Sequence, residues 1–139
     1  MRRYLLDTGV LAAYLQGRPG AVRLISPWIQ QRAVATSVLT YAEVPEYLLG
    51  HPDYRRRRAQ LRELMREIQP YTLTYAALDR YGDLRRRLRP PHGPGLIGDI
   101  DTLIAATALA RNLTVVTLDA DYRRVPGLQV QLLPRASLR

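Results

Sequence analysis

The chain has 139 residues, a formal net charge of +9 and no cysteine. All of its 21 basic side chains are arginine, so lysine is absent as well. Without cysteine the chain has no disulfide, no thiolate nucleophile and no zinc–thiolate site. Without lysine it has neither a P-loop nor a Schiff-base nucleophile. The excess of positive charge favours a polyanionic partner, with nucleic acid as the first candidate.

The length fits one domain, which we place at residues 1–133, and residues 134–139 are expected to form a frayed tail. No apolar run approaches the roughly 20 residues that are needed to cross a bilayer. An acidic residue also follows the first apolar residues too soon for a signal peptide. We therefore expect a soluble cytoplasmic protein that has no membrane partner.

The predicted elements alternate between strands and helices along the chain. Apolar runs predict short strands at residues 1–6, 33–36, 71–74, 113–118 and 128–132. Apolar residues at helical spacing predict helices at residues 10–15, 21–31, 53–69, 77–88 and 99–110. A further helix is expected to be capped by Ser37 or Thr40 and to continue through Leu49. Clusters of glycine and proline separate several of these segments. This alternation predicts an α/β fold in which helices cover both faces of a mainly parallel sheet.

Residues 96–109 are the most informative stretch of the sequence. Asp99 and Asp101 stand at its front, and no further charge follows until Arg111. Because nearly every side chain of the helix is apolar or small, the helix is predicted to be buried on all sides. Capping of free backbone N–H groups explains one carboxylate at the start of such a helix. The second carboxylate indicates that this position binds something else.

Four carboxylates from distant parts of the sequence are predicted to reach one edge of the sheet. Asp7 follows the first strand and Asp119 follows the fourth. Asp101 begins the buried helix, and Glu43 lies on the helix after the second strand. Ligands of open parallel sheets bind beyond the carboxyl ends of the strands, which is the edge that all four acids can reach.

Each of these carboxylates also has a purely structural interpretation. Asp7 is able to cap the first helix, and Asp119 is able to form an Asx turn. Glu43 has the spacing of a capping box with Thr40. A structural explanation of the whole set therefore requires several separate capping roles, one for each acid.

Four ionised carboxylates cannot share a small volume without a counter-charge. Two of them about 4 Å apart repel by roughly 1 kcal/mol in water and by about 4 kcal/mol at an effective dielectric constant of 20. Either some of the groups are protonated or a divalent cation binds. Oxygen ligands without cysteine or clustered histidine favour Mg²⁺ or Mn²⁺. Such a site in an arginine-rich chain suggests hydrolysis of phosphodiester bonds.

Four segments of the chain share the pattern of a known family. They are Asp7-Thr8, Ala42-Glu43-Val44, Asp101-x-x-Ile104-Ala105-Ala106-Thr107-Ala108 and Val116-Thr117-x-Asp119-x-Asp121-Tyr122. Together they resemble the PIN-domain nucleases, and their spacing is most similar to the VapC-type toxins of toxin–antitoxin pairs. The resemblance implies a PIN-like three-layer α/β/α sandwich with a central, mainly parallel sheet of about five short strands.

The resemblance also implies an activity, a set of site residues and partners. The acidic residues of the family correspond here to Asp7, Glu43, Asp101 and Asp119, which are therefore the candidate catalytic residues. Asp7 and Asp101 would bind the principal Mg²⁺ or Mn²⁺, with Glu43, Asp119 and also Asp99 as secondary ligands. The implied protein is a metal-dependent endoribonuclease that hydrolyses RNA, forms a homodimer and is inhibited by a cognate antitoxin.

Other functions remain open at this point. A housekeeping PIN nuclease would process RNA without an antitoxin, and a noncatalytic PIN module would only bind RNA or protein. A phosphoacceptor domain with Asp7 as acceptor disagrees with the sequence, because such sites are expected to use a lysine. The arginines of residues 55–66 and 85–89 form either solvated helix faces or tracks for an RNA backbone. Tyr122 stands where the family usually has Phe.

Overall fold

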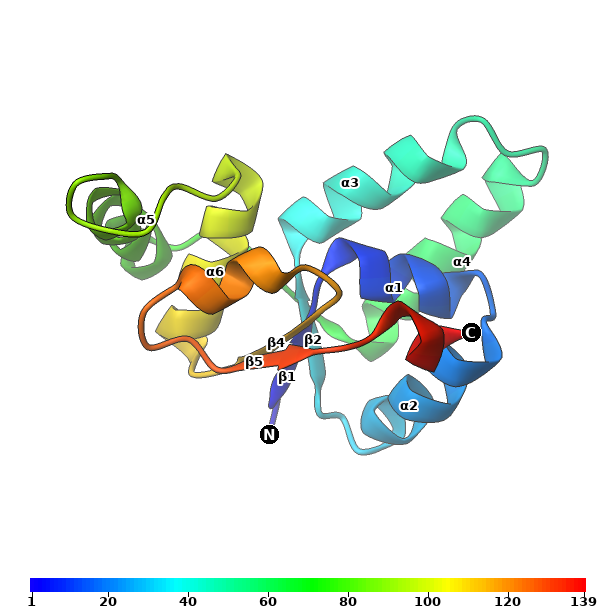
Figure 1. The fold of residues 1–139 in the computed structure, drawn as a ribbon. Helices are drawn as coiled ribbons and strands as arrows, with labels where there is room; N and C mark the ends of the chain where they lie inside the picture. Colours follow the sequence, from blue (N-terminus) through cyan, green and yellow to red (C-terminus); the bar gives the residue numbers. More distant parts are fainter.

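A five-stranded parallel sheet forms the centre of the structure, a computed structural model that describes residues 1–139 (Figure 1). The strands lie in the order β3-β2-β1-β4-β5, and every neighbouring pair is parallel. Their bounds are β1 (Tyr4–Leu6), β2 (Val34–Ser37), β3 (Gln69–Tyr71), β4 (Thr114–Thr117) and β5 (Val130–Leu132). This arrangement confirms the α/β fold predicted from the alternation of strands and helices.

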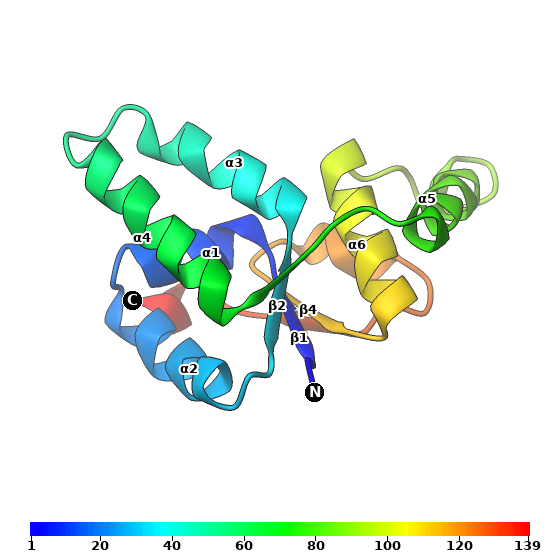
Figure 2. The same cartoon turned by 180° about the vertical axis from the view of Figure 1, so that it is seen from behind.

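Helices cover both faces of the sheet, as Figures 1 and 2 show from opposite sides. One layer contains α1 (Thr8–Leu15), α2 (Pro19–Gln30), α3 (Val38–Leu48) and α4 (Tyr54–Glu67). The other layer contains α5 (Tyr75–Leu88), α6 (Asp99–Arg111) and the short 3₁₀ helix η1 (Ala120–Arg124). None of the helices combines the length and the apolar character that crossing a bilayer requires.

Alternate residues of each central strand separate the two apolar cores. Leu6 and Val116 face the layer of α1 to α4, whereas their neighbours Leu5 and Val115 face α5 and α6. All four side chains are fully buried, as expected for an interior parallel strand with helices on both sides. The register pairs Leu5 with Val115 and Leu6 with Val116, so that side chains of one face lie next to each other.

The α6 helix is buried, in agreement with its uncharged sequence. Ile104, Ala105, Ala106 and Ala108 have no solvent exposure. The many alanines allow α6 to lie close to the sheet and to α5 at the same time, because they occupy little space. The helix ends at Asn112, whose φ of 56° is in the left-handed region that asparagine tolerates better than most residues. Asp101 in its first turn is therefore held by a rigid element.

The sheet has a topological switch between β1 and β4. From β1 the chain continues to β2 on one side, whereas from β4 it continues to β5 on the other. The segments that leave the carboxyl ends of these two strands thus diverge and leave a crevice, which is where open α/β sheets bind their ligands. Asp7 and Asp119 are the residues that occupy these two strand ends.

Two predicted elements differ from the structure. The third strand spans Gln69–Tyr71 instead of residues 71–74, and it includes Pro70. This position tolerates proline because β3 is an edge strand, where one side of the backbone needs no ladder partner. Residues 72–74 lead into α5 instead, with Thr74 as its N-cap.

The second difference is the tail, which is ordered instead of frayed. Its residues form the 3₁₀ helix η2 (Arg135–Leu138), which lies beside α2. Leu138 is 1% exposed and belongs to the core between the sheet and α1 to α4. The backbone N–H of Gly20 donates a hydrogen bond to the carbonyl of Arg139 at 2.9 Å. The burial of one leucine therefore anchors the segment.

Replacement of Leu138 tests this anchor. Leu138→Ala is expected to lower the free energy of unfolding by about 2–4 kcal/mol, because it leaves a cavity in the core. Leu49→Ala removes the same atoms from a side chain that is 65% exposed, and it should cost less than about 0.5 kcal/mol. Urea denaturation measures both changes. Equal, small effects would show that residues 134–139 do not contribute to the core.

Candidate active site

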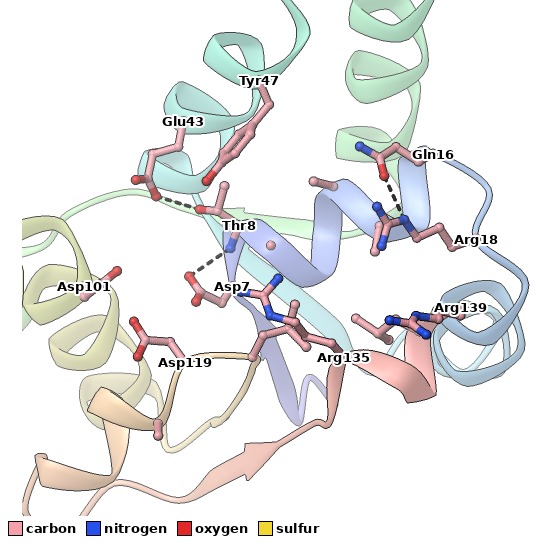
Figure 3. A pocket seen from close by; sticks show the side chains of 16 residues that line it. Asp7, Thr8, Gln16, Arg18, Glu43, Tyr47, Asp101, Asp119, Arg135 and Arg139 are labelled. Atoms are coloured by element: carbon pink, nitrogen blue, oxygen red, sulfur yellow. Dashed lines mark hydrogen bonds between the residues drawn. The ribbon is translucent and has the colours of Figure 1, made fainter.

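Four acidic side chains from different elements line one open cavity of about 780 Å³. They are Asp7 at the end of β1, Glu43 on α3, Asp101 on α6 and Asp119 after β4. Figure 3 shows them at the same end of the cavity, with their carboxylates facing its interior. The structure thus brings together the four acids that the sequence pattern selects, at the carboxyl edge of the sheet.

Asp7 is held by both of its carboxylate oxygens. The backbone N–H of Thr8 donates to Oδ1 at 2.8 Å, so Asp7 caps α1 as its structural interpretation predicted. The hydroxyl of Thr117 donates to Oδ2, also at 2.8 Å. Burial raises the pKa of Asp7, although these hydrogen bonds oppose the increase. Capping and membership of the acidic cluster are therefore properties of the same side chain.

Glu43 is positioned by a contact that the sequence did not indicate. The hydroxyl of Thr8 donates to Glu43 Oε1 at 2.6 Å, which ties α3 to the start of α1 (Figure 3). The predicted capping box of Thr40 with Glu43 is wrong, because Ser37 caps α3 through a hydrogen bond from the Leu39 N–H. The helix continues through Pro45 and presents Glu43 to the cavity.

Asp7 and Asp101 are linked through the hydroxyl of Tyr122. This hydroxyl lies 3.2 Å from Asp7 Oδ1 and 3.1 Å from Asp101 Oδ1. The tyrosine is fully buried, and its burial, followed by the two carboxylates, raises its pKa well above the ordinary value. The hydroxyl carries one proton, so it donates to one carboxylate at a time. The other carboxylate keeps an incompletely compensated charge or takes up a proton.

The pKa of Asp101 reflects this crowding. Burial first, and then the negative charges of Asp7, Asp119 and Glu43, together raise it from 3.8 to about 6, against the hydrogen bond from Tyr122. An aspartate that is protonated near pH 6 is unusual and is typical of a functional cluster of acids. The electrostatics of the cavity therefore favour the entry of positive charge.

Asp119 completes the acidic end of the cavity from the side of β4. Its carboxylate accepts a hydrogen bond from the Asp121 N–H at 2.9 Å, which is the Asx turn expected for this position. Its own N–H donates to the hydroxyl of Thr117 at 3.0 Å. Since Thr117 also holds Asp7, one threonine at the end of β4 sets the relative position of both acids.

Asp99 does not join this group. Its carboxylate forms an ion pair with Arg85 of α5 at 2.6 Å, and it accepts a hydrogen bond from the Tyr81 hydroxyl at 3.4 Å. It does not line the cavity. The placement disagrees with the hypothesis that Asp99 is a secondary metal ligand, because the side chain on the first turn of α6 turns toward α5.

Two features of the site escaped the sequence analysis. The pattern located an aromatic residue at Tyr122, but the direction of its hydroxyl depends on how η1 packs against α6. The cavity also contains Arg18, Arg135 and Arg139, of which the last two belong to the segment expected to fray. The apolar Leu138 between two arginines was the available signal that this segment docks on the core.

The side chains are not arranged as a complete metal-binding cluster. No group of three or more histidine, aspartate or glutamate side chains is placed to hold a metal ion directly. The acidic end instead consists of the linked pair Asp7 and Asp101, with Glu43 and Asp119 on the same cavity wall.

Comparisons with known proteins agree with this architecture. The sequence profile of the PIN domain matches residues 4–128. No curated protein sequence matches the chain significantly.

Several solved structures have the same fold. The structure is similar to a chain of VapBC2 from Rickettsia felis, crystallised with a promoter DNA fragment, with a TM-score of 0.81 and 21% sequence identity. The match covers 94% of this chain and 98% of that one. For DNA-bound VapBC from Salmonella typhimurium the TM-score is 0.80 at 21% identity, with the same coverage of 94% and 98%. For VapBC-5 from Mycobacterium tuberculosis it is 0.66 at 25% identity, with coverage of 96% and 98%.

The structural likenesses establish the fold over nearly the whole chain, and the profile match covers most of the sequence. The match also includes all four acids of the cavity. The chain therefore belongs to the PIN domain family of nucleases, whose members generally depend on a divalent metal ion.

Proposed function

We propose that this PIN domain is a metal-dependent endoribonuclease and the toxin of a toxin–antitoxin pair. The observation that carries the proposal is the meeting of Asp7, Glu43, Asp101 and Asp119 in one cavity at the topological switch of the sheet. The reaction is the hydrolysis of an RNA phosphodiester bond by water. The positive net charge of +9 favours binding of the RNA backbone.

The acidic end fits Mg²⁺ or Mn²⁺. Mg²⁺ in proteins is usually held by one or two carboxylates and keeps several of its waters, which agrees with the pair Asp7 and Asp101 and the absence of a third direct ligand. When bound, the cation supplies an activated water and charge compensation at the phosphate. Asp101 would give up the proton that it holds below about pH 6 when such a cation is bound.

The remaining residues of the site have positioning roles in this proposal. Thr8 fixes the carboxylate of Glu43, and Thr117 fixes that of Asp7. Glu43 on α3 and Asp119 after β4 line the same cavity, and their carboxylates are able to accept hydrogen bonds from water. They therefore orient the attacking water, and one of them takes its proton as the bond to phosphorus forms. The bond from phosphorus to the 3′-oxygen breaks, and that oxygen takes up a proton from water. Tyr122 keeps Asp7 and Asp101 at a constant separation.

Removal of the charge at position 101 tests the proposed chemistry. Asp101→Asn is expected to lower the rate of RNA cleavage at least about a hundredfold, because the substitution removes a direct metal ligand. EDTA should abolish cleavage by the wild type, and Mn²⁺ or Mg²⁺ should restore it. The measurement is the cleavage of a labelled structured RNA.

The neighbouring acid supplies a matched control for this experiment. Asp99→Asn makes the same chemical change two residues away, outside the cavity. Asp99 forms an ion pair with Arg85, and the aspartate side chain of this pair is 68% exposed. The variant should therefore keep the wild-type rate within about twofold. Undiminished cleavage by Asp101→Asn, or cleavage in EDTA, would contradict the mechanism. RNA that binds but stays intact with Mg²⁺ would indicate a noncatalytic module.

The pKa of Asp101 predicts a pH dependence with a definite sign. Because protons and metal compete for this carboxylate, cleavage at subsaturating Mg²⁺ should fall about tenfold per pH unit below about pH 6. Without metal, the folded chain holds a proton between about pH 4 and 6 that the unfolded chain has released. Stability in EDTA should therefore decrease as pH rises through this range.

Denaturation in EDTA and cleavage rates across pH 5 to 8 measure the two effects. Asp101→Asn cannot titrate, so it should lose this part of the stability profile and be more stable than the wild type above pH 6. If the stabilities of the wild type and of Asp101→Asn in EDTA change equally steeply from pH 4 to pH 6, the pKa of Asp101 is not raised.

The proposed partners are a cognate antitoxin and a second copy of the chain. The structurally similar chains come from VapBC complexes, one described as belonging to a toxin–antitoxin family, which supports an antitoxin that acts on this chain in the cytoplasm. Exposed apolar side chains on α3 and α5, among them Tyr47 at 67% and Tyr75 at 87% exposure, support a homodimer.

The α5 side chains make the dimer testable. The double variant Tyr75→Arg and Leu78→Arg should be a monomer by light scattering, because two charges replace exposed apolar contacts, with an unchanged circular dichroism spectrum. The control is the single substitution Val22→Arg on the exposed face of α2, which should leave the mass of the wild type. A wild-type monomer, or an α5 variant that keeps the dimer mass, would exclude this interface.

A further inference from the structure

The cavity that contains the four acids also has a basic end. Arg18, Arg135 and Arg139 line it together with the acids. In Figure 3, Arg135 extends toward Asp7 and Asp119, whereas Arg18 and Arg139 lie farther from the acidic end. One continuous cavity therefore presents negative charge at one end and positive charge at the other.

The three arginines are available to bind an anion. None of them takes part in an ion pair, and all of the salt bridges in the structure use other arginines. Arg18 donates only to the side-chain oxygen of Gln16, at 3.0 Å. Each of the three residues is exposed to solvent. Guanidinium groups in this state are able to form paired hydrogen bonds with the oxygens of a phosphate.

Two of these arginines, Arg135 and Arg139, are positioned by the close packing of η2 against α2. Gly20 lies so close to the segment that a Cβ atom at this position would clash with the carbonyl oxygen of Ser137. The Gly20 N–H donates to the carbonyl of Arg139, and Leu138 between the two arginines is buried. The backbone that carries Arg135 and Arg139 is therefore fixed relative to the acids.

We propose that Arg18, Arg135 and Arg139 form a phosphate-binding subsite that holds the RNA backbone beside the bond to be cleaved. This inference rests on the proposed ribonuclease function and assigns the part of the cavity that binds substrate. A nucleic-acid strand carries one phosphate to the acidic end and its neighbours to the arginines, so it fits both ends of the cavity. The arginines line the same cavity as the proposed cleavage site, which RNA enters as the substrate and an acidic peptide does not.

The double variant Arg135→Ala and Arg139→Ala tests the subsite. Loss of two phosphate contacts should raise KM for RNA about tenfold and leave kcat within about twofold, because the acids are unchanged. The salt dependence of RNA binding should also become weaker, with a log–log slope smaller by about 1.4 for a single strand. Fluorescence anisotropy of labelled RNA in EDTA measures binding without any cleavage.

Two further variants separate the position of the arginines from their charge. Gly20→Ala keeps every arginine but displaces η2, so it should raise KM to a similar extent. Arg135→Lys keeps the charge and should recover part of the affinity that Arg135→Ala loses. The control is Arg23→Ala with Arg80→Ala, which removes two exposed arginines outside the cavity and should leave KM within about twofold.

The outcomes distinguish this inference from the function on which it rests. If the double variant binds RNA in EDTA as tightly as the control pair does, the subsite is wrong, whether or not the wild type cleaves RNA. If it loses affinity for polyglutamate but not for RNA, the basic end binds acidic peptides instead. If the wild type does not cleave RNA with Mg²⁺, the proposed function fails, while the binding data still decide the role of the arginines.

Discussion

The close approach of Asp7 and Asp101 is the interaction on which the site depends. Both carboxylates contact one buried hydroxyl, so two like charges lie near each other where water screens them poorly. Two ionised carboxylates about 6 Å apart repel by about 3 kcal/mol at an effective dielectric constant near 20. The end of β1 and the first turn of α6 must therefore be held by interactions that do not involve the acids themselves.

The two apolar cores supply this support. Leu5 of β1 and Ile104 of α6 belong to one core, and Leu6 belongs to the other. Each is fully buried, and side chains of this kind contribute about 1.5–3 kcal/mol each when removed from water. The strand and the helix thus have enough apolar contact to keep two acids in an unfavourable arrangement. Such stored repulsion favours a ligand that carries the opposite charge.

Structural and chemical roles coincide in several of these acids. Asp7 caps α1 and Asp119 forms an Asx turn, as their structural interpretations predicted, yet both also face the cavity. The two interpretations were alternatives at the level of the sequence only. In the fold they are compatible, because the carboxylate of a residue at the end of a parallel strand can cap the next element and still face the cavity at that edge of the sheet.

Much of the fold was predictable from local patterns. The uncharged run after Asp101 indicated a buried helix, and the acids at strand ends indicated the edge of the sheet where they lie. Both are consequences of periodicity and of the rule that parallel strands end on the same side. The PIN family assignment is confirmed by the profile match. The catalytic and metal-binding roles of the four acids stay predictions.

The features that could not be predicted depend on contacts between distant residues. The position of β3 is set by its pairing with β2, in which Pro70 lies opposite Thr36. Docking of residues 134–139 depends on Gly20, which is far away in the sequence. The contact of Thr8 with Glu43 replaced a local capping box, because α1 and α3 are neighbours only in the folded chain. Local spacing contains no information about any of these pairs.

The brevity of β1 has a consequence for how accurately the chain must fold. The strand has only three residues, and its two apolar side chains enter opposite cores. A slip by one residue against β4 would exchange the faces of Leu5 and Leu6 and move Asp7 by about 3.3 Å along the sheet. That displacement exceeds the length of a Mg²⁺–oxygen bond, about 2.1 Å. Under the proposed mechanism, a chain with a misaligned sheet would therefore lose its activity while most of its structure was still folded.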